Sequence, residues 1–268
     1  MKMNKTSKQT ITDFGKQWKK FPDNKGYYGS VDLFKDFCGT LISEEDVRGK
    51  SVLEIGSGTG RIVNMLIALG AKHVYAIEPS ESYDVLISNT KLSRDKVTCY
   101  QVSGENLPSM EVDLAISFGV LHHIPEPKPV VDRVYEVLKK GGKFIVWVYG
   151  YEGNETYLSI FLPLRKVTSK LPDFLLDIIA NGLNYFAGIY IGFCKVFELP
   201  LKKYVLTVFN RLDWKSRRMV IFDQLNPEYA KYYHKEEAVS LLKKAGFINI
   251  VSFHRHAYSW TLLGEKPS

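Results

Sequence analysis

The sequence is poor in cysteine and has no long apolar run near its N-terminus. Its three cysteines, Cys38, Cys99 and Cys194, are spread over 268 residues and form no CxxC pair. This spacing argues against a disulfide framework and against a structural zinc site, and such sparse usage is typical of a reducing compartment. The basic residues among the first twenty positions are not followed by an apolar segment, which argues against a signal peptide. We therefore expect a cytoplasmic protein.

The sequence also lacks a dense patch of one charge. Its hydrophobic share of 45%, aromatic share of 13% and charged share of 24% exclude a disordered or collagen-like chain. The net charge is +7, but the basic residues are scattered, and the largest local cluster is Lys215, Arg217 and Arg218. This distribution is typical of a solvated surface and argues against nucleic acid as a partner. The small cluster could still meet a phosphate on an anionic small-molecule acceptor.

One apolar stretch tests the expectation of a soluble protein. Residues 178–194 contain no charge, and their length is near the lower limit for a membrane span. However, Asn181, Asn184 and three glycines interrupt the stretch, and its polar or small positions recur every three or four residues. This pattern predicts a helix with a narrow polar stripe, packed as part of a lid. The second reading is a helix that lies on a membrane surface or contacts lipid through residues 174–199.

From residue 50 the sequence alternates between short apolar runs and amphipathic segments. Helices of this length between strands indicate a parallel sheet with right-handed crossovers. We therefore predict an α/β fold: a Rossmann-like, doubly wound, mostly parallel seven-stranded sheet with a helical insertion (lid) after the fifth strand. The expected strands are 51–55, 73–77, 97–102, 112–117, 143–149, 248–254 and 259–263, and the expected helices include 61–69, 81–92, 129–140 and 235–244. The predicted organisation is an N-terminal helical and aromatic cap (1–50), a core (51–151 and 233–268), and an insertion (152–232) that forms the lid and acceptor pocket.

A glycine-rich loop follows the first predicted strand, in the segment VLEIGSGTGR at 52–61. Its glycines at 56, 58 and 60 allow a sharp turn and a close approach of the backbone to a ligand, which could be NAD, FAD or a nucleoside sulfonium. The dinucleotide fingerprint places its third glycine at position 61, which is Arg61 here. Glu78 ends the second predicted strand, where a carboxylate can accept hydrogen bonds from both hydroxyls of a ribose. Its alternative role is to begin the following helix.

Together with SGENLP (103–108) and SFGVLHHIPEP (117–127), these segments resemble class I methyltransferases that use S-adenosylmethionine. The resemblance covers residues 50–150 and 235–264 and is greatest to the branch with quinone-biosynthesis and other small-molecule enzymes. A weaker similarity, in FDQLNPEY (222–229) and HAYSWTLLG (256–264), is to methyltransferases associated with surface polysaccharides. The resemblance implies S-adenosylmethionine as cofactor, with S-adenosylhomocysteine as product.

The resemblance also assigns residues to the parts of the cofactor. The family commonly has an aspartate in place of Ser103, so adenine recognition here would rest on the Ser103 hydroxyl and on backbone N–H groups. The implied cofactor residues are Glu54, Gly56, Ser57, Gly58 and Gly60 for the methionine end, Glu78 and Pro79 for the ribose, Ser103, Gly104 and Glu105 for the adenine, and Phe118, Gly119 and Val120 beside the sulfonium.

The acceptor is predicted to be a small molecule, with a hydroxyl of a sugar or glycan precursor as first choice. A lipid or quinone acceptor and a non-catalytic binding protein remain open alternatives. A hydroxyl acceptor benefits from a general base, and the candidates are His123, His234 and His122, with His254 and His256 as further options on one strand face. Each histidine could instead pack in a loop, cap a helix or face solvent. Because no tight cluster of acids and histidines is visible, we expect no metal ion.

The NPEY segment at 226–229 resembles a motif of amino-methylating methyltransferases. In those enzymes the motif directly follows the fourth strand, a place that SFGVLHH occupies here. We therefore predict a turn and helix start at 226–229. The oligomeric state is not determined by the sequence.

Overall fold

The computed structural model describes residues 5–169, 171–226 and 229–268, and these contain a seven-stranded sheet with the strand order β3-β2-β1-β4-β5-β7-β6. Neighbouring strands from β3 to β5 are parallel, whereas β7 is antiparallel to both β5 and β6. The strands are β1 (Ser51–Ile55), β2 (His73–Ile77), β3 (Val97–Tyr100), β4 (Val112–Phe118), β5 (Leu138–Tyr149), β6 (Ile248–Arg255) and β7 (Ser259–Glu265). The predicted Rossmann-like, mostly parallel architecture is thereby confirmed.

Helices cover both faces of the sheet because its central strands are apolar on both sides. In β1, Val52 belongs to the core beneath α2 and α3, whereas the adjacent Leu53 belongs to the core beneath α5 and α10. Successive side chains of a strand point to opposite faces, so a continuous apolar run needs a helical layer on each. The helices of the core and of the first fifty residues are α1 (Lys5–Lys20), α2 (Val31–Cys38), α3 (Arg61–Ala68), α4 (Tyr83–Thr90), α5 (Lys128–Val137) and α10 (Lys235–Lys243), with short 3₁₀ turns at Gly26–Gly29, Lys91–Ser93, Gly104–Asn106 and Leu121–His123.

One boundary differs clearly from the sequence expectation. The helix predicted over 129–140 ends at Val137, and β5 begins at once with Leu138. The Gly141-Gly142 pair, read as a helix stop, lies inside β5, where the pairing with β4 shifts register between Val112 and Leu114. Tertiary pairing with a neighbouring strand overrides the local helical preference of this segment.

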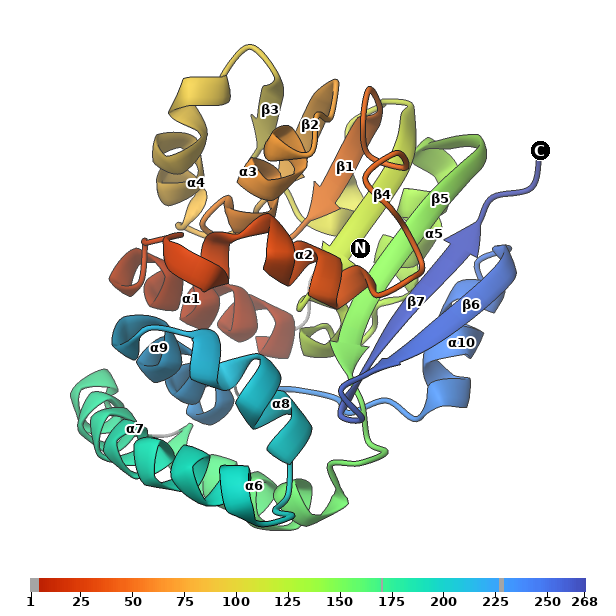
Figure 1. The fold of residues 1–268 in the computed structure, drawn as a ribbon. Coiled ribbons are helices and arrows are strands. Elements are labelled where there is room, and N and C mark those ends of the chain that lie inside the picture. The colour runs from red at the N-terminus through yellow and green to blue at the C-terminus, as the bar shows by residue number, and fades with distance from the viewer. Residues whose placement is uncertain (1–4, 170, 227–228) are drawn as a thin grey trace.

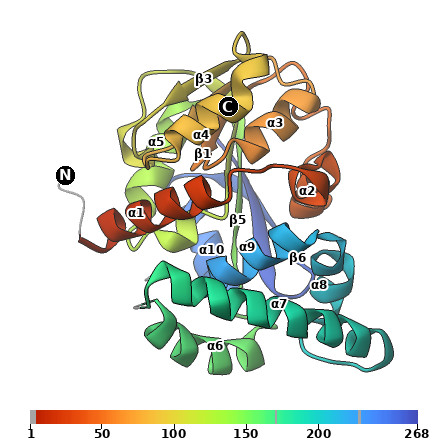
Figure 2. The same cartoon turned by 90° about the vertical axis from the view of Figure 1, so that its left-hand side faces the viewer.

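The segment after β5 contains α6 (Glu155–Thr168), α7 (Asp173–Val196), α8 (Lys202–Thr207), a 3₁₀ turn (Phe209–Arg211) and α9 (Trp214–Leu225). These helices lie beyond the carboxyl ends of the parallel strands, together with α1, and α6 and α7 form the layer furthest from the sheet (Figures 1 and 2). Of the described helices, one stretch, Phe174–Val196, is long and apolar enough to cross a membrane by length and composition. The predicted turn at 226–229 includes residues 227 and 228, which lie outside the described residues.

Candidate active site

A cleft of about 240 Å³ opens at the carboxyl ends of the parallel strands. Ligands of open α/β sheets bind at this edge. The cleft brings together nearly all residues that the resemblance assigned to the cofactor: Glu54, Gly56, Ser57, Gly58, Glu78, Pro79, Ser103, Gly104, Glu105, Phe118, Gly119 and Val120. Gly60 is placed next to it, at the N-cap of α3. Four loops far apart in the sequence therefore meet around one space.

The glycine loop after β1 is shaped for close approach. Gly56 has a φ of 75°, and a Cβ there would lie 2.4 Å from Cγ2 of Val120. Gly58 has a φ of 52°, and its N–H donates to Oε2 of Glu78 at 2.7 Å. Positive φ favours glycine, and the missing side chains leave the backbone exposed to a ligand.

Glu78 is buried at the end of β2 and holds this loop in place. Besides the bond from Gly58, its Oε1 accepts from the N–H of Ser80 at 2.9 Å. Each carboxylate oxygen has a second lone pair, which is left for a ribose hydroxyl. The carboxylate can therefore fix the loop and bind a sugar at the same time.

Glu54 carries the most informative electrostatic signal in the cleft. The residue is buried, and its Oε2 has no hydrogen-bond partner. Burial raises the pKa of Glu54 to about 8, although Ser57 and Arg61 oppose the shift. A buried carboxylate without a partner needs a cation or a donor. The ammonium group of a methionine moiety supplies both, so this residue fits the cofactor implied by the sequence.

The adenine end differs from the family pattern as the sequence indicated. Ser103 lines the cleft, and its hydroxyl accepts from Nδ2 of Asn106 at 2.8 Å. Gly104 and Glu105 follow in a short 3₁₀ turn whose backbone borders the same space. A Cβ on Gly104 would lie 2.8 Å from Val130, so the backbone packs tightly against α5 there.

One wall of the cleft comes from α1, which lies in the predicted N-terminal helical and aromatic cap. Ser7, Thr10, Ile11, Phe14 and Trp18 all line the cleft. Their spacing of three or four residues places them on one helix face, and this periodicity was the signal that could have found them. The same wall includes Tyr28, whose ring is covered by the guanidinium of Arg61 at 4.1 Å from the ring centroid. An apolar and aromatic wall thus faces the cofactor loops.

His123 is the one histidine of the three base candidates that lines this cleft. Its Nδ1–H donates to the carbonyl oxygen of Tyr229 at 2.9 Å, since a carbonyl can only accept. This bond leaves Nε2 as the basic nitrogen of the neutral ring. Burial lowers the pKa of His123, while the carboxylate of Asp223 opposes the change. The ring is therefore neutral and basic at pH 7, and Phe14 contacts its edge.

The other histidines lie elsewhere. His122 is fully buried, stacks on Tyr149 with centroids 3.8 Å apart, and neither ring nitrogen has a partner. Neither His122 nor His234 is among the described residues that line the cleft. His234 is the N-cap of α10, and its Nδ1 lies 3.4 Å from Oε1 of Glu152. The expectation that His254 and His256 share a strand face is wrong, because β6 ends at Arg255 and His256 lies in the following turn with a φ of 49°.

A partly buried polar cluster lies next to His123 and connects α1 and β5 to the insertion. Asp223 on α9 accepts from Nε2 of Gln17 on α1 at 2.8 Å and from the Tyr149 hydroxyl on β5 at 3.1 Å. Gln224 donates to the same tyrosine oxygen at 2.9 Å. Within the described residues, α6 to α9 contribute no side chain to the cleft lining. The insertion thus contacts α1 and the surroundings of His123 from behind, and its role as lid and acceptor pocket stays a prediction.

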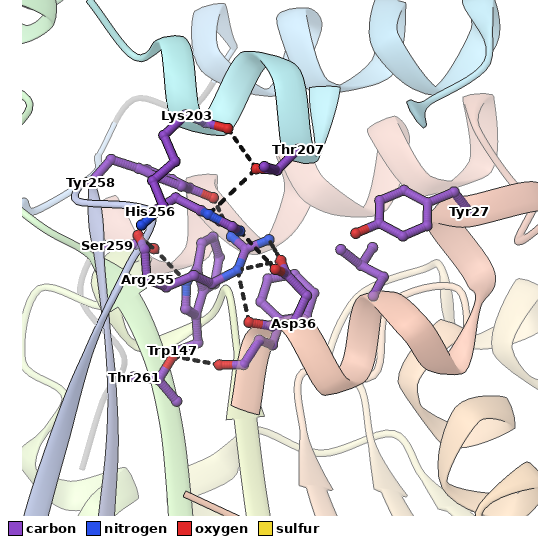
Figure 3. A network of polar contacts seen from close by, with 12 residues as sticks. Tyr27, Asp36, Trp147, Lys203, Thr207, Arg255, His256, Tyr258, Ser259 and Thr261 are labelled. Atoms are coloured by element: carbon purple, nitrogen blue, oxygen red, sulfur yellow. Dashed lines mark hydrogen bonds and ion pairs between the residues drawn. The ribbon is translucent and has the colours of Figure 1, made fainter. Parts of the chain in front are cut away.

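A second network connects the cap, the insertion and the closing hairpin (Figure 3). Arg255 is buried, and its guanidinium pairs with Asp36 of α2. The His256 ring lies between Asp36, with Nε2 2.7 Å from Oδ1, and Thr207 of α8, with Nδ1 3.4 Å from the hydroxyl oxygen. Although burial raises the pKa of Asp36, the hydrogen bond from His256 and the charge of Arg255 lower it overall. This network fixes the cap and α8 against the sheet.

The fold and the cleft together define a class I methyltransferase domain, the class whose cofactor is S-adenosylmethionine. Residues 53–146 match the family model described as a methyltransferase domain. The match spans the glycine loop, Glu78, the adenine turn and His123.

Similar proteins support this class. A tRNA U34 carboxymethyltransferase of Idiomarina loihiensis is 26% identical over 148 residues, which are 52% of this chain and 46% of the relative. An uncharacterized methyltransferase of Mycobacteroides abscessus is 26% identical over 48% of this chain and 51% of the relative. The chain spans about half the length of such curated relatives. The methyltransferase SibL has the same fold, with a TM-score of 0.53 and 12% identity over 88% of this chain and 55% of SibL.

Proposed function

We propose that this protein transfers a methyl group from S-adenosylmethionine to a hydroxyl of a small-molecule acceptor, with a sugar or glycan precursor as the first class to test. One observation carries the proposal: His123, with Nε2 as its basic nitrogen, lines the same cleft as the cofactor residues. The sulfonium of the bound cofactor supplies a methyl group whose leaving group is neutral.

The residues of this chain would bind the cofactor, orient the acceptor and remove the proton of its hydroxyl. Glu54 binds the ammonium end and Glu78 the ribose, while the aromatic wall of α1 closes the cleft and excludes water. His123 accepts the acceptor's proton at Nε2, and the bond from Nδ1–H to Tyr229 keeps the ring in the required tautomer. Alignment of the hydroxyl with the methyl group supplies the remaining rate enhancement.

The cleft lining favours a small acceptor over a nucleic acid. Among the described lining residues the one permanently charged cation is Arg61, and its guanidinium lies over the Tyr28 ring. The cluster of Lys215, Arg217 and Arg218 contributes nothing to this lining, and Arg218 pairs with Asp177. Since some relatives are named as tRNA enzymes, tRNA is the competing acceptor in the test.

A lipid or quinone acceptor is the second candidate, and a specific observation favours it. The insertion exposes a row of apolar side chains along α7, described below, on the side of the molecule where α1 and the carboxyl ends lie (Figure 1). An acceptor with an apolar tail would suit both this surface and the apolar wall of α1.

Cofactor binding is tested first, by calorimetric titration with S-adenosylhomocysteine. We expect binding by the wild type, a large loss in Glu78→Ala, and no binding of NADH as control. Binding of NADH instead, or equal binding of S-adenosylhomocysteine by Glu78→Ala, would contradict the proposal.

Methyl transfer is then measured from radiolabelled cofactor to nucleotide sugars, lipid-linked sugars, quinones and tRNA. Replacing the base in His123→Gln should lower kcat by about 10²- to 10⁴-fold while S-adenosylhomocysteine still binds. The wild-type rate should fall below pH 6.5, since burial lowers the pKa of His123, and this acid limb should vanish in the variant. His254→Gln is the matched control, because His254 stacks on Trp260 outside the cleft. Methylation of tRNA alone would refute the small-molecule assignment.

A further inference from the structure

The exposed apolar surface of the protein is concentrated on α6 and α7. In the described residues, seventeen large apolar side chains are exposed, and twelve of them lie between positions 162 and 197. We call this set the apolar face; it consists of Leu162, Leu164, Val167, Phe174, Ile178, Tyr185, Phe186, Ile189, Tyr190, Phe193, Val196 and Phe197. Single exposed apolar residues are ordinary, but eight of these twelve follow one side of α7, and such a row marks a contact surface.

The packing of α7 against the rest of the fold fixes which side of the helix is exposed. Leu176, Ala180, Ile191 and Cys194 recur at helical spacing on the opposite side and are buried against α8 and α9. On the same side Nδ2 of Asn184 donates to the carbonyl oxygen of Trp214 at 3.0 Å. The polar stripe predicted for this helix thus faces the protein at Asn184, and the large apolar side chains lie on the exposed side.

This arrangement is the reverse of a helix that faces water. A water-facing helix exposes its charged side chains, whereas α7 exposes aromatic and aliphatic ones over about 36 Å of its length. Asp177, near the start of α7, pairs with Lys20 and Arg218. Because α7 packs along its whole length, it can lie on an apolar medium but cannot cross one without leaving the fold.

The charged side chains of the helices that carry or adjoin the apolar face indicate which kind of surface it contacts. Lys166, Lys195, Lys203 and Lys215 are exposed and form no ion pair with another described residue. Of the acids in the same part of the described chain, Asp177 and Glu198 are paired, while Glu155 and Asp213 are exposed at the starts of α6 and α9, so the unpaired lysines outnumber the unpaired acids named here. Lys195 precedes Val196 of the face, and Lys215 follows Trp214, whose ring contacts Tyr185. A row of apolar and aromatic side chains with lysines at its border fits an anionic lipid surface.

A second copy of the chain fits this face less well. A two-fold symmetric contact places the same residues opposite one another, so it would bring the bordering lysines of both copies together. The chain already carries a net charge of +7. An anionic bilayer can bury the apolar face and attract the lysines at the same time.

We propose that the apolar face of α6 and α7 docks the protein on the surface of a bilayer that contains anionic lipid. Docking does not depend on methyl transfer. It places the cleft side of the molecule toward the membrane, where an acceptor with a lipid tail would be found.

The test is flotation of the full chain with vesicles. We expect the wild type to bind phosphatidylcholine vesicles that contain phosphatidylglycerol, and to bind pure phosphatidylcholine far more weakly. The double variant Phe186→Asp with Ile189→Asp should bind at least roughly tenfold more weakly, because two apolar contacts are lost. The matched control is Leu92→Asp, which changes the exposed Leu92 after α4 and should bind as the wild type does.

A second variant addresses charge without altering the apolar face. Replacing Lys166, Lys195, Lys203 and Lys215 by glutamine should weaken binding to anionic vesicles by about fivefold per lysine. Thermal melting and S-adenosylhomocysteine titration show whether each variant is folded.

Three outcomes would overturn the proposal. The first is wild-type protein that floats with neither kind of vesicle. The second is equal binding of the wild type to vesicles with and without phosphatidylglycerol, which would show that anionic lipid is not required. The third is a wild-type dimer in sedimentation that Phe186→Asp converts to a monomer, which would assign the face to self-association.

Discussion

Replacing Glu54 by glutamine should remove a pH-dependent loss of stability from the protein without cofactor. Burial raises the pKa of Glu54 from 4.5 to about 8. Between these values the folded state holds a proton that the unfolded state releases, so the free energy of unfolding falls as pH rises. The stabilising contribution is complete below about pH 4.5 and lost by about pH 8.

The magnitude follows from the size of the shift. Each unit is worth about 1.4 kcal/mol, so the 2.5 units between 4.5 and pH 7 correspond to roughly 3 kcal/mol, and the loss reaches roughly 4 kcal/mol at pH 8. Glutamine is neutral at every pH. We therefore expect Glu54→Gln to match the wild type near pH 4.5 and to exceed it by several kcal/mol at pH 8.

Cofactor binding should change in the opposite direction. An ammonium group requires the ionised carboxylate, so the wild type should release a proton when it binds S-adenosylhomocysteine at pH 7. Loss of this charge-assisted bond should weaken binding by Glu54→Gln by about 1.5–3 kcal/mol, or roughly ten- to a hundredfold. The variant should therefore be more stable and bind more weakly.

Two assays separate these effects. Urea denaturation at pH 5 and pH 8 measures the stability difference, and calorimetry at pH 7 in buffers of low and high ionisation enthalpy counts the released proton. Glu111→Gln, which changes an exposed carboxylate outside the cleft, is the control. The reasoning is refuted if wild type and Glu54→Gln lose stability equally with pH, or if they bind S-adenosylhomocysteine with equal affinity and proton release.

Two further predictions concern the glycine loop after β1 and the network around Arg255 and Asp36 that Figure 3 shows. Gly56→Ala should abolish S-adenosylhomocysteine binding and lower the melting temperature, because alanine is strained at a φ of 75° and its Cβ would meet Val120. Calorimetry and thermal melting measure the two effects. Unchanged affinity would contradict the prediction. Asp36→Ala should destabilise the fold by about 3–5 kcal/mol, because it leaves the buried Arg255 without its carboxylate. The effect should shrink at acidic pH: the lowered pKa of Asp36 stabilises the wild type above the unfolded value of 3.8, and this gain is lost as pH falls through the folded value. Urea denaturation measures both, and a pH-independent effect below 1 kcal/mol would count against it.

Most of the sheet could be predicted because its signals are local. The apolar run of Ser51–Ile55, followed by glycines with positive φ, defines a strand, a turn and a helix start within a few residues. The boundary at Val137 could not be predicted, because the pairing of Leu138 with Val112 is a contact between residues far apart in the sequence.

The sequence by itself determined the parallel core and the position of the cofactor loops, since the carboxyl ends of parallel strands meet at one edge of the sheet. Tertiary packing alone decided which histidine reaches the cleft. His122 and His123 are neighbours in one short turn and both are buried, but of these two His123 alone lines the cleft. Tertiary packing also decided which side of α7 faces outward. The helix is apolar almost all round, so only its contacts with α8 and α9 distinguish an inner face from an outer one.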